Sequence, residues 1–129
     1  MAVIRPFNAF RPHEKTAHLV ASVPYDVINR IEAAELAKGN PITMLRVTRS
    51  EIEMKAEIDV YSQDVYLKAK ENWQRLIKEA PMIQDDEPRF YVYKLVMGNQ
   101  TQVGISATFS VEDYLNDVIK KHEKTRQVK

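Results

Sequence analysis

The chain has 129 residues, about the size of one globular domain, and can bury a real hydrophobic core. Lys and Arg number 19 against 18 for Asp and Glu, so the near-neutral charge gives no support to a nucleic-acid partner. Because cysteine is absent, disulfides, thiolate zinc sites and a cysteine nucleophile are excluded. We find no signal-peptide core and no run of about 18 apolar residues, which predicts a cytoplasmic protein without a membrane partner.

The first ten residues predict an edge strand or an extended packed segment. Pro6 and Pro12 argue against a central strand, because proline cannot donate a hydrogen bond to a neighbouring strand. Arg5 lies among apolar residues, and two interpretations of it remain open. Its guanidinium is either exposed to solvent or held near a ligand.

A proline corner follows a short apolar stretch. Residues 17–23 predict a buried strand, and Pro24 forces extended geometry on the residue before it. The residues Tyr25 and Asp26 then form a rigid turn ahead of a helix, so we take them as candidate ligand-binding residues. A purely local role for Asp26, as a turn or helix-start acceptor, is the alternative.

Two further segments are predicted from turn chemistry and alternation. Asn29 and Glu32 have the spacing of a capping box and Gly39 suits a helix end, so a helix is expected over 30–38. Residues 43–48 alternate like a strand.

Charged residues are frequent over 46–59, and the role of the two arginines in this stretch is left open. Arg46 and Arg49 either line a pocket mouth or are solvated. Residues 50–59 are rich in charge, which predicts a surface connection.

The second half predicts the main helix and a hairpin. Apolar residues at three- and four-residue steps predict a helix over 61–79, with Trp73 in the core. An acidic, solvated turn at 84–88 precedes strands at 89–97 and 102–109. Both hairpin faces carry apolar residues, so we expect the hairpin to be central and covered on both sides. Ser110 then starts a last helix, expected over 111–120.

The fold predicted from these elements is α+β in a single domain over 1–129. A mixed or mainly antiparallel sheet, with a central hairpin at about 89–109, is packed by the long helix and by shorter helices. Only three glycines occur, so no glycine-rich phosphate cradle can be built from this chain alone. His122 lacks the second histidine of a zincin helix, and no metal site is predicted.

The last residues hold the densest set of chemical groups. His122, Glu123, Thr125 and Arg126 place imidazole, carboxylate, hydroxyl and guanidinium groups just beyond a helix end. We take His122 as a candidate general acid/base with Glu123 orienting it, and Thr125 and Arg126 as candidate ligand-binding residues. A solvated linker is the alternative. Without a downstream domain, the tail is expected to be exposed and mobile from about Lys124 onward.

Four motifs in the same order resemble a known family. They are IRPF at 4–7, PYDV at 24–27, GNP at 39–41 followed by RVTR at 46–49, and VIKKHEKTR at 118–126. Together they are similar to the bacterial and archaeal family called domain of unknown function 1015. The similarity runs across nearly all of the chain, and PYDV and KKHEKTR are its most specific parts.

The resemblance implies that this chain is the N-terminal fragment of a longer protein. Members of the family carry a downstream segment that resembles the partition-protein-B/sulfiredoxin fold, which includes nucleotide-dependent serine kinases. The implied activity is nucleotide-linked phosphotransfer on serine or a similar small metabolite. A nucleotide cofactor is then expected only in the longer protein, with the downstream domain as partner.

Two function hypotheses follow. In the first, the chain is half of a small-molecule phosphotransfer site, inactive as this fragment, in which Arg5, Tyr25 and Asp26 converge with the segment 122–126. In the second, it is a non-catalytic interaction or scaffold domain. The near-neutral charge and the lack of a complete catalytic motif favour the second hypothesis.

Overall fold

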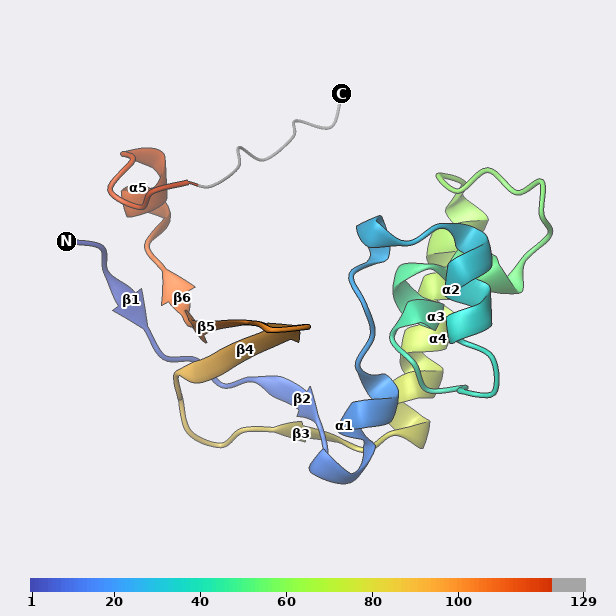
Figure 1. Cartoon of the computed structure of the whole chain (residues 1–129), viewed down its shortest axis with the longest axis horizontal. Helices are drawn as coiled ribbons and strands as arrows, with labels where there is room; N and C mark the ends of the chain where they lie inside the picture. Colours follow the sequence, from blue (N-terminus) through green and yellow to red (C-terminus); the bar gives the residue numbers. More distant parts are fainter. Residues whose placement is uncertain (122–129) are drawn as a thin grey trace. The chain divides into compact units, whose positions relative to one another are not determined.

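The chain forms two compact units, seen here in a computed structural model that describes residues 1–121 (Figure 1). The first unit joins Met1–Ala9 to the segment that starts at Gln84, and the second is Phe10–Ile83. Helices and antiparallel strand pairs are both present, which confirms the α+β class. In chain order the main elements are β1 (Ile4–Arg5), β2 (Phe10–Pro12), α1 (Glu14–Val20), α2 (Arg30–Leu36), α3 (Leu45–Thr48), α4 (Gln63–Glu79), β3 (Met82–Gln84), β4 (Tyr91–Met97), β5 (Gln100–Ser106), β6 (Thr108–Phe109) and α5 (Val111–Leu115).

The core of the second unit is built on α4. Apolar residues recur along this helix every three or four positions and Pro81 follows its end, so the helix predicted over 61–79 is confirmed as Gln63–Glu79. Trp73 packs against the core as predicted, and its ring meets that of Phe10 edge-on with centroids 6.2 Å apart. The centre of the core consists of four buried residues, Val20, Ile42, Leu76 and Ala80.

Residues 17–23 do not form the predicted strand, because most of them belong to α1. His13 caps this helix by accepting a hydrogen bond from the Lys15 amide at 3.1 Å. Val20, in the last turn, is 3% exposed and joins the core. A short apolar run fits a strand or a buried helix equally well by pattern alone, and here the cap and the core contact decide for the helix.

Residues 43–48 are also helical, which corrects the predicted strand. Leu45–Thr48 is the single turn α3, and the Thr43 hydroxyl accepts a hydrogen bond from the Leu45 amide at 3.4 Å. The Asn72 amide of α4 donates to the Arg46 carbonyl at 2.6 Å and ties the turn to the long helix. Contacts with α4 thus outweigh the strand propensity of this sequence.

The helix α2 confirms its predicted start. Asn29 accepts hydrogen bonds from the amides of the first turn, and Glu32 reaches back to the Asn29 amide at 2.8 Å, so both halves of the capping box are present. The helix ends at Leu36 rather than at 38, and Gly39 follows with a φ of +71°. This left-handed conformation favours glycine and allows the chain to leave the helix.

A carboxylate that is 16% exposed holds the segment after α3. The predicted surface connection over 50–59 is therefore wrong for residues 50–54, but it is confirmed at the exposed residues 55–57 and 59. The Glu53 carboxylate contacts Arg46 at 2.5 Å, Arg75 at 3.2 Å and Lys68 at 3.5 Å. Arg46 is therefore paired inside the second unit rather than solvated. Burial alone raises the pKa of Glu53, but hydrogen bonds from Arg46, Arg75 and Asn72 lower it by more, so the pKa lies below its ordinary value of 4.5.

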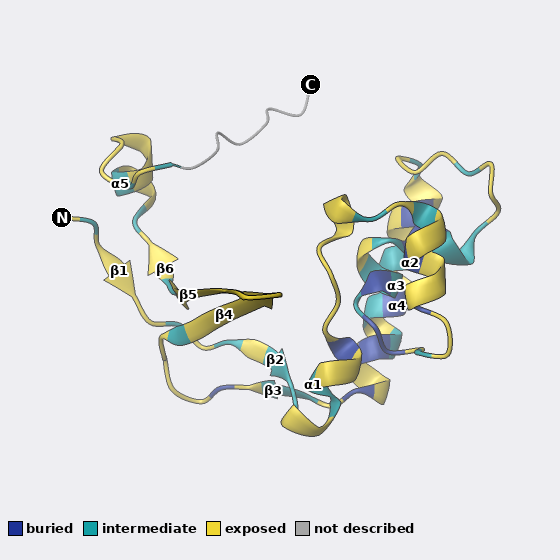
Figure 2. Ribbon diagram, viewed as in Figure 1, coloured by how far each residue is buried: buried dark blue, intermediate teal, exposed yellow. Residues whose placement is uncertain are grey.

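In the first unit, β4 and β5 form the predicted hairpin. Their register pairs Met97 with Gln100 across a two-residue loop, whose first residue, Gly98, has a φ of +57°. The expectation that both faces are covered is wrong. The strands form a two-stranded sheet, and Figure 2 shows them almost entirely exposed, whereas nearly all of the buried residues belong to the second unit.

The acidic turn is only partly solvated, because Asp85 is buried at 6% exposure. The Tyr91 hydroxyl donates to the Asp85 carboxylate at 2.6 Å and accepts from the Ala9 amide at 2.9 Å. The Phe7 ring packs against Tyr91 with centroids 5.0 Å apart. A buried carboxylate needs such a partner, and Tyr91, the first residue of β4, supplies it.

The predicted edge strand and the last helix are present in shorter form. β1 pairs antiparallel with β6, with Ile4 opposite Phe109. Ser110 caps α5 by accepting from the Asp113 amide at 3.2 Å, and the Asp113 carboxylate accepts from the Val3 amide at 2.7 Å. The helix ends at Leu115, five residues before the predicted end at 120.

Two leucines on α4 test the position of the core. Leu76 is 1% exposed and Leu67 is 54% exposed on the same helix. We expect Leu76→Ala to lower the free energy of unfolding by about 2–5 kcal/mol, because it leaves a cavity. Leu67→Ala should change it by less than about 0.5 kcal/mol. Urea unfolding followed by the fluorescence of Trp73 measures both, and equal losses would contradict the assigned core.

The Glu53 network predicts a pH dependence. Because the folded-state pKa is below the ordinary value of 4.5, the stabilisation is complete above that value and is lost as the pH falls through the folded pKa. We expect Glu53→Gln to cost about 1–3 kcal/mol of unfolding free energy at pH 7 and less at pH 3. Glu35→Gln is the matched control, since its side chain is 75% exposed. A constant difference at both pH values would contradict the assignment.

Candidate functional site

The predicted site residues fall into three groups. Arg5 lies on β1 in the first unit, and Tyr25 and Asp26 lie in a short 3-10 turn of the second unit. The candidates His122, Glu123, Thr125 and Arg126 are outside the described residues, as is the tail from Lys124 onward. The predicted convergence of these groups therefore stays a prediction, and each described group is considered in its own unit.

Tyr25 lines a pocket within the second unit, which we call the corner pocket. The pocket has a volume of about 400 Å³, which is in the range of small-molecule sites. Its apolar wall comes from α4 through Val65 and Ala69. The polar residues that line it are Tyr25, Thr48, Arg49, Ser50, Glu51, Tyr61 and Tyr66.

Arginine contacts position the backbone on one side of the corner pocket. Arg49 donates to the Ile28 carbonyl, which connects the residues after α3 with those after the proline corner. Arg30 donates to three carbonyls of the segment that follows Glu51, and to the Glu51 carbonyl itself at 2.6 Å. Ser50 adds a further link, since its hydroxyl donates to the Val65 carbonyl at 2.8 Å. These hydrogen bonds supply donors for the carbonyl groups of an irregular segment, which has no strand partner to bind them.

Arg49 and Glu51 place one charge of each sign at the corner pocket. The Arg49 guanidinium contacts a Glu51 carboxylate oxygen at 3.2 Å, and their side chains are 24% and 5% exposed. Arg49 is therefore paired at a pocket wall rather than solvated. The pair neutralises itself, and the pocket offers both a donor group and an acceptor group to a bound molecule.

Three tyrosines complete the lining. Tyr25, Tyr61 and Tyr66 are 60%, 80% and 56% exposed. Tyr61 precedes α4 and Tyr66 lies in its second turn, so both come from the same end of the long helix. Exposed aromatic rings around a charged pair can stack on a planar group or contact a cation.

Asp26 has no local role among the described residues. Its side chain is exposed and accepts no hydrogen bond from them. The turn closes through the backbone instead, where the Val27 amide donates to the Pro24 carbonyl at 3.4 Å. The alternative of a turn or helix-start acceptor is therefore not seen, and Asp26 stays a candidate on sequence grounds.

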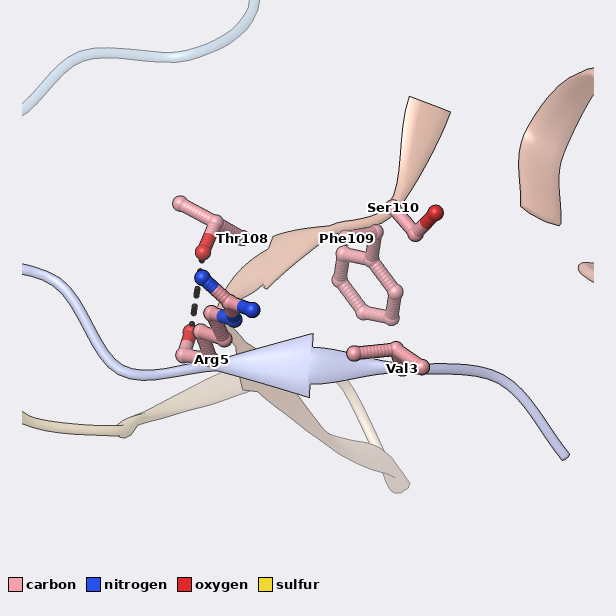
Figure 3. Close-up of a pocket in the computed structure, with 5 residues that line it drawn as sticks. All are labelled: Val3, Arg5, Thr108, Phe109 and Ser110. Atoms are coloured by element: carbon pink, nitrogen blue, oxygen red, sulfur yellow. Dashed lines mark hydrogen bonds between the residues drawn. The ribbon is translucent and has the colours of Figure 1, made fainter. Parts of the chain in front are cut away.

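Arg5 lines a separate pocket of about 320 Å³ in the first unit. Figure 3 shows Arg5 on β1 and Val3 just before this strand, with Thr108, Phe109 and Ser110 opposite. The Thr108 hydroxyl donates to the Arg5 carbonyl at 3.1 Å. The Arg5 side chain is exposed, and among the described residues it makes no ion pair. The pocket combines an exposed guanidinium with a phenyl ring and hydroxyls.

Sequence reasoning missed Glu51, Ser50 and the aromatic lining. Glu51 lies in a charge-rich run that predicts exposure, whereas it is 4% exposed and its carbonyl accepts a hydrogen bond from the distant Arg30. Tyr61 has the three- and four-residue spacing of the apolar residues on the predicted helix, and this spacing alone does not distinguish a pocket-lining ring from a core ring. Within residues 1–121, no group of three or more His, Asp or Glu could hold a metal ion, and no helix has the length and apolar character to cross a membrane.

A family model covers nearly all of this sequence, although comparison with curated proteins and with solved structures found no match. The model is described as protein of unknown function (DUF1015) and matches residues 4–129. That range contains the proline corner, the RVTR segment and the tail motif that suggested the family. The chain therefore belongs to the family of proteins of unknown function called DUF1015.

Proposed function

We propose that this chain supplies the small-molecule half of a nucleotide-linked phosphotransfer site, with serine or a similar small metabolite as the ligand. The observation that carries the proposal is the corner pocket, which is lined both by Tyr25 of the PYDV motif and by the Arg49–Glu51 pair. A guanidinium suits a carboxylate or phosphate, and a carboxylate suits an ammonium or hydroxyl group. Small phosphorylated metabolites and their precursors carry these groups.

The other half of the site is assigned to a downstream domain of the same protein. A nucleotide's phosphates need a cradle of backbone amides, and three glycines in this chain are too few for a glycine-rich one. His122 and Glu123 are the proposed acid/base pair, and Arg126 with Thr125 the proposed phosphate contacts. Arg5, whose guanidinium is exposed, is a second candidate contact to an anionic group.

A non-catalytic interaction domain is the second candidate function, and the hairpin favours it. The register places Val92 opposite Ile105, and Val96, four residues further along β4, lies on the same face. These side chains are 75%, 65% and 63% exposed. Monomeric proteins rarely expose a contiguous apolar patch, and such a face is typical of a protein interface.

The 129-residue chain should bind ligand without turning it over. With L-serine and ATP–Mg²⁺, we expect no phosphorylation and no nucleotide hydrolysis above buffer, because the phosphate cradle is absent. In a ¹H–¹⁵N titration with L-serine, saturable shifts should appear at the amides of Tyr25, Ser50 and Tyr66. Tyr25→Ala should weaken this binding about tenfold.

Tyr93→Ala is the matched control, because Tyr93 is 59% exposed, like Tyr25 at 60%, but lies on the hairpin. It should leave serine binding unchanged. If the 129-residue chain phosphorylates serine or hydrolyses ATP, and His122→Ala abolishes this activity, then the proposal that the nucleotide half of the site lies in another domain is contradicted. Shifts confined to the hairpin would remove the corner pocket as the ligand site and favour the interaction domain.

A further inference from the structure

The outer edge of β5 has no strand partner among the described residues. β4 and β5 form a sheet of two strands, and no other described strand pairs with either of them (Figure 1). Every residue of the two strands is exposed except Tyr91 and Ser106, which are paired with each other. A hairpin of two strands is at best marginally stable in water, and it gains stability from further strands or from a packed helix. An added strand would therefore stabilise this hairpin.

Charge distinguishes the two edges of the hairpin. The seven residues of β5 are QTQVGIS, all uncharged, whereas β4 has Lys94 at its centre. Natural proteins protect an exposed edge with charged residues, proline or a bulge, because an unprotected edge pairs with other strands. β5 contains no proline, and its register with β4 advances one residue at a time without a bulge. The edge of β5 is therefore the one that is open to pairing.

The sequence of β5 suits a second copy of the same strand. In an antiparallel pair with a two-fold axis at Val103, this residue faces its own copy, Thr101 faces Ile105, and no charges meet. Pairs of β-branched residues are favourable at such positions. The same arrangement of β4 would place Lys94 opposite its own copy, where like charges are destabilising. The charge pattern thus favours β5, with a second copy of β5 as its partner.

We propose that two copies of this chain associate through their β5 edges, and that the two hairpins then form one antiparallel sheet in the order β4–β5–β5–β4. Backbone groups on the two outer edges bind each other in this sheet. The inference does not depend on the proposed ligand, because β5 lies outside the second unit, which contains the corner pocket. It concerns the edge of the hairpin rather than its apolar face.

Sedimentation velocity of the 129-residue chain tests the association. One strand pair is a small interface compared with the roughly 1,600 Å² of a standard one, so we expect a dissociation constant above about 1 μM. The dimer fraction should rise between about 1 μM and about 1 mM, and the amide resonances of residues 100–106 should shift with it. A chain that stays monomeric over this range would overturn the proposal.

Two matched double variants test whether the interface is the edge of β5. Thr101→Lys with Ile105→Lys places like charges opposite each other in the dimer, so it should raise the dissociation constant at least about tenfold. Val92→Lys with Val96→Lys adds the same charge to the same face of the hairpin, but on β4. The two β4 strands would lie roughly 14 Å apart, beyond the screening length of about 8 Å at physiological salt, so this control should dimerise normally. Equal weakening by both double variants would overturn β5 as the interface.

Mixing oppositely charged variants tests the pairing without relying on a loss of binding. Thr101→Glu with Ile105→Glu should also be monomeric by itself, because like charges again meet. Mixed with Thr101→Lys/Ile105→Lys, it should form a heterodimer, since position 101 of each copy then faces an opposite charge at position 105 of the other. Recovery of the dimer would also show that both double variants are folded. A mixture that stays monomeric would overturn the antiparallel pairing of β5 with its copy.

Discussion

Hydrogen bonds from arginine side chains to backbone carbonyls hold the part of this structure on which the candidate site depends. The segment after α3 is neither a long helix nor a sheet strand, so its carbonyls have few backbone partners. Arg30 donates to the carbonyls of Glu51, Met54, Lys55 and Ala56. A lysine could not replace it, because only a planar guanidinium presents several donors in a fixed arrangement.

The sequence predicts well those elements that are formed by interactions between residues close together in the chain. The capping box of Asn29 lies within four residues, and the three- and four-residue apolar spacing of α4 runs along one helix. The hairpin follows from alternation on both sides of Gly98, and its register then fixes which side chains share a face. In each case the interaction that forms the element connects residues that are near in the chain.

The predictions that fail are those that distant contacts decide. Residues 43–48 alternate like a strand, yet the Asn72 amide of α4 binds the Arg46 carbonyl and the segment is helical. The sequence around Glu51 predicts a solvated charge, because nothing near it shows that Arg30, 21 residues earlier, will donate to its carbonyl. Tyr25 could be named as a candidate from the proline corner, but its pocket neighbours are 22 to 44 residues away in the chain.

The central claim is that arginine contacts fix the pocket wall that carries Glu51. Hydrogen exchange in Arg30→Lys tests it most directly, at the Ile52 and Met54 amides, which donate to the carbonyls of Arg49 and Glu51 at 3.1 Å. Arg89→Lys is the control, since Arg89 is 55% exposed and lies outside the second unit. The account predicts faster exchange at both amides in Arg30→Lys alone. Unchanged exchange there would contradict it.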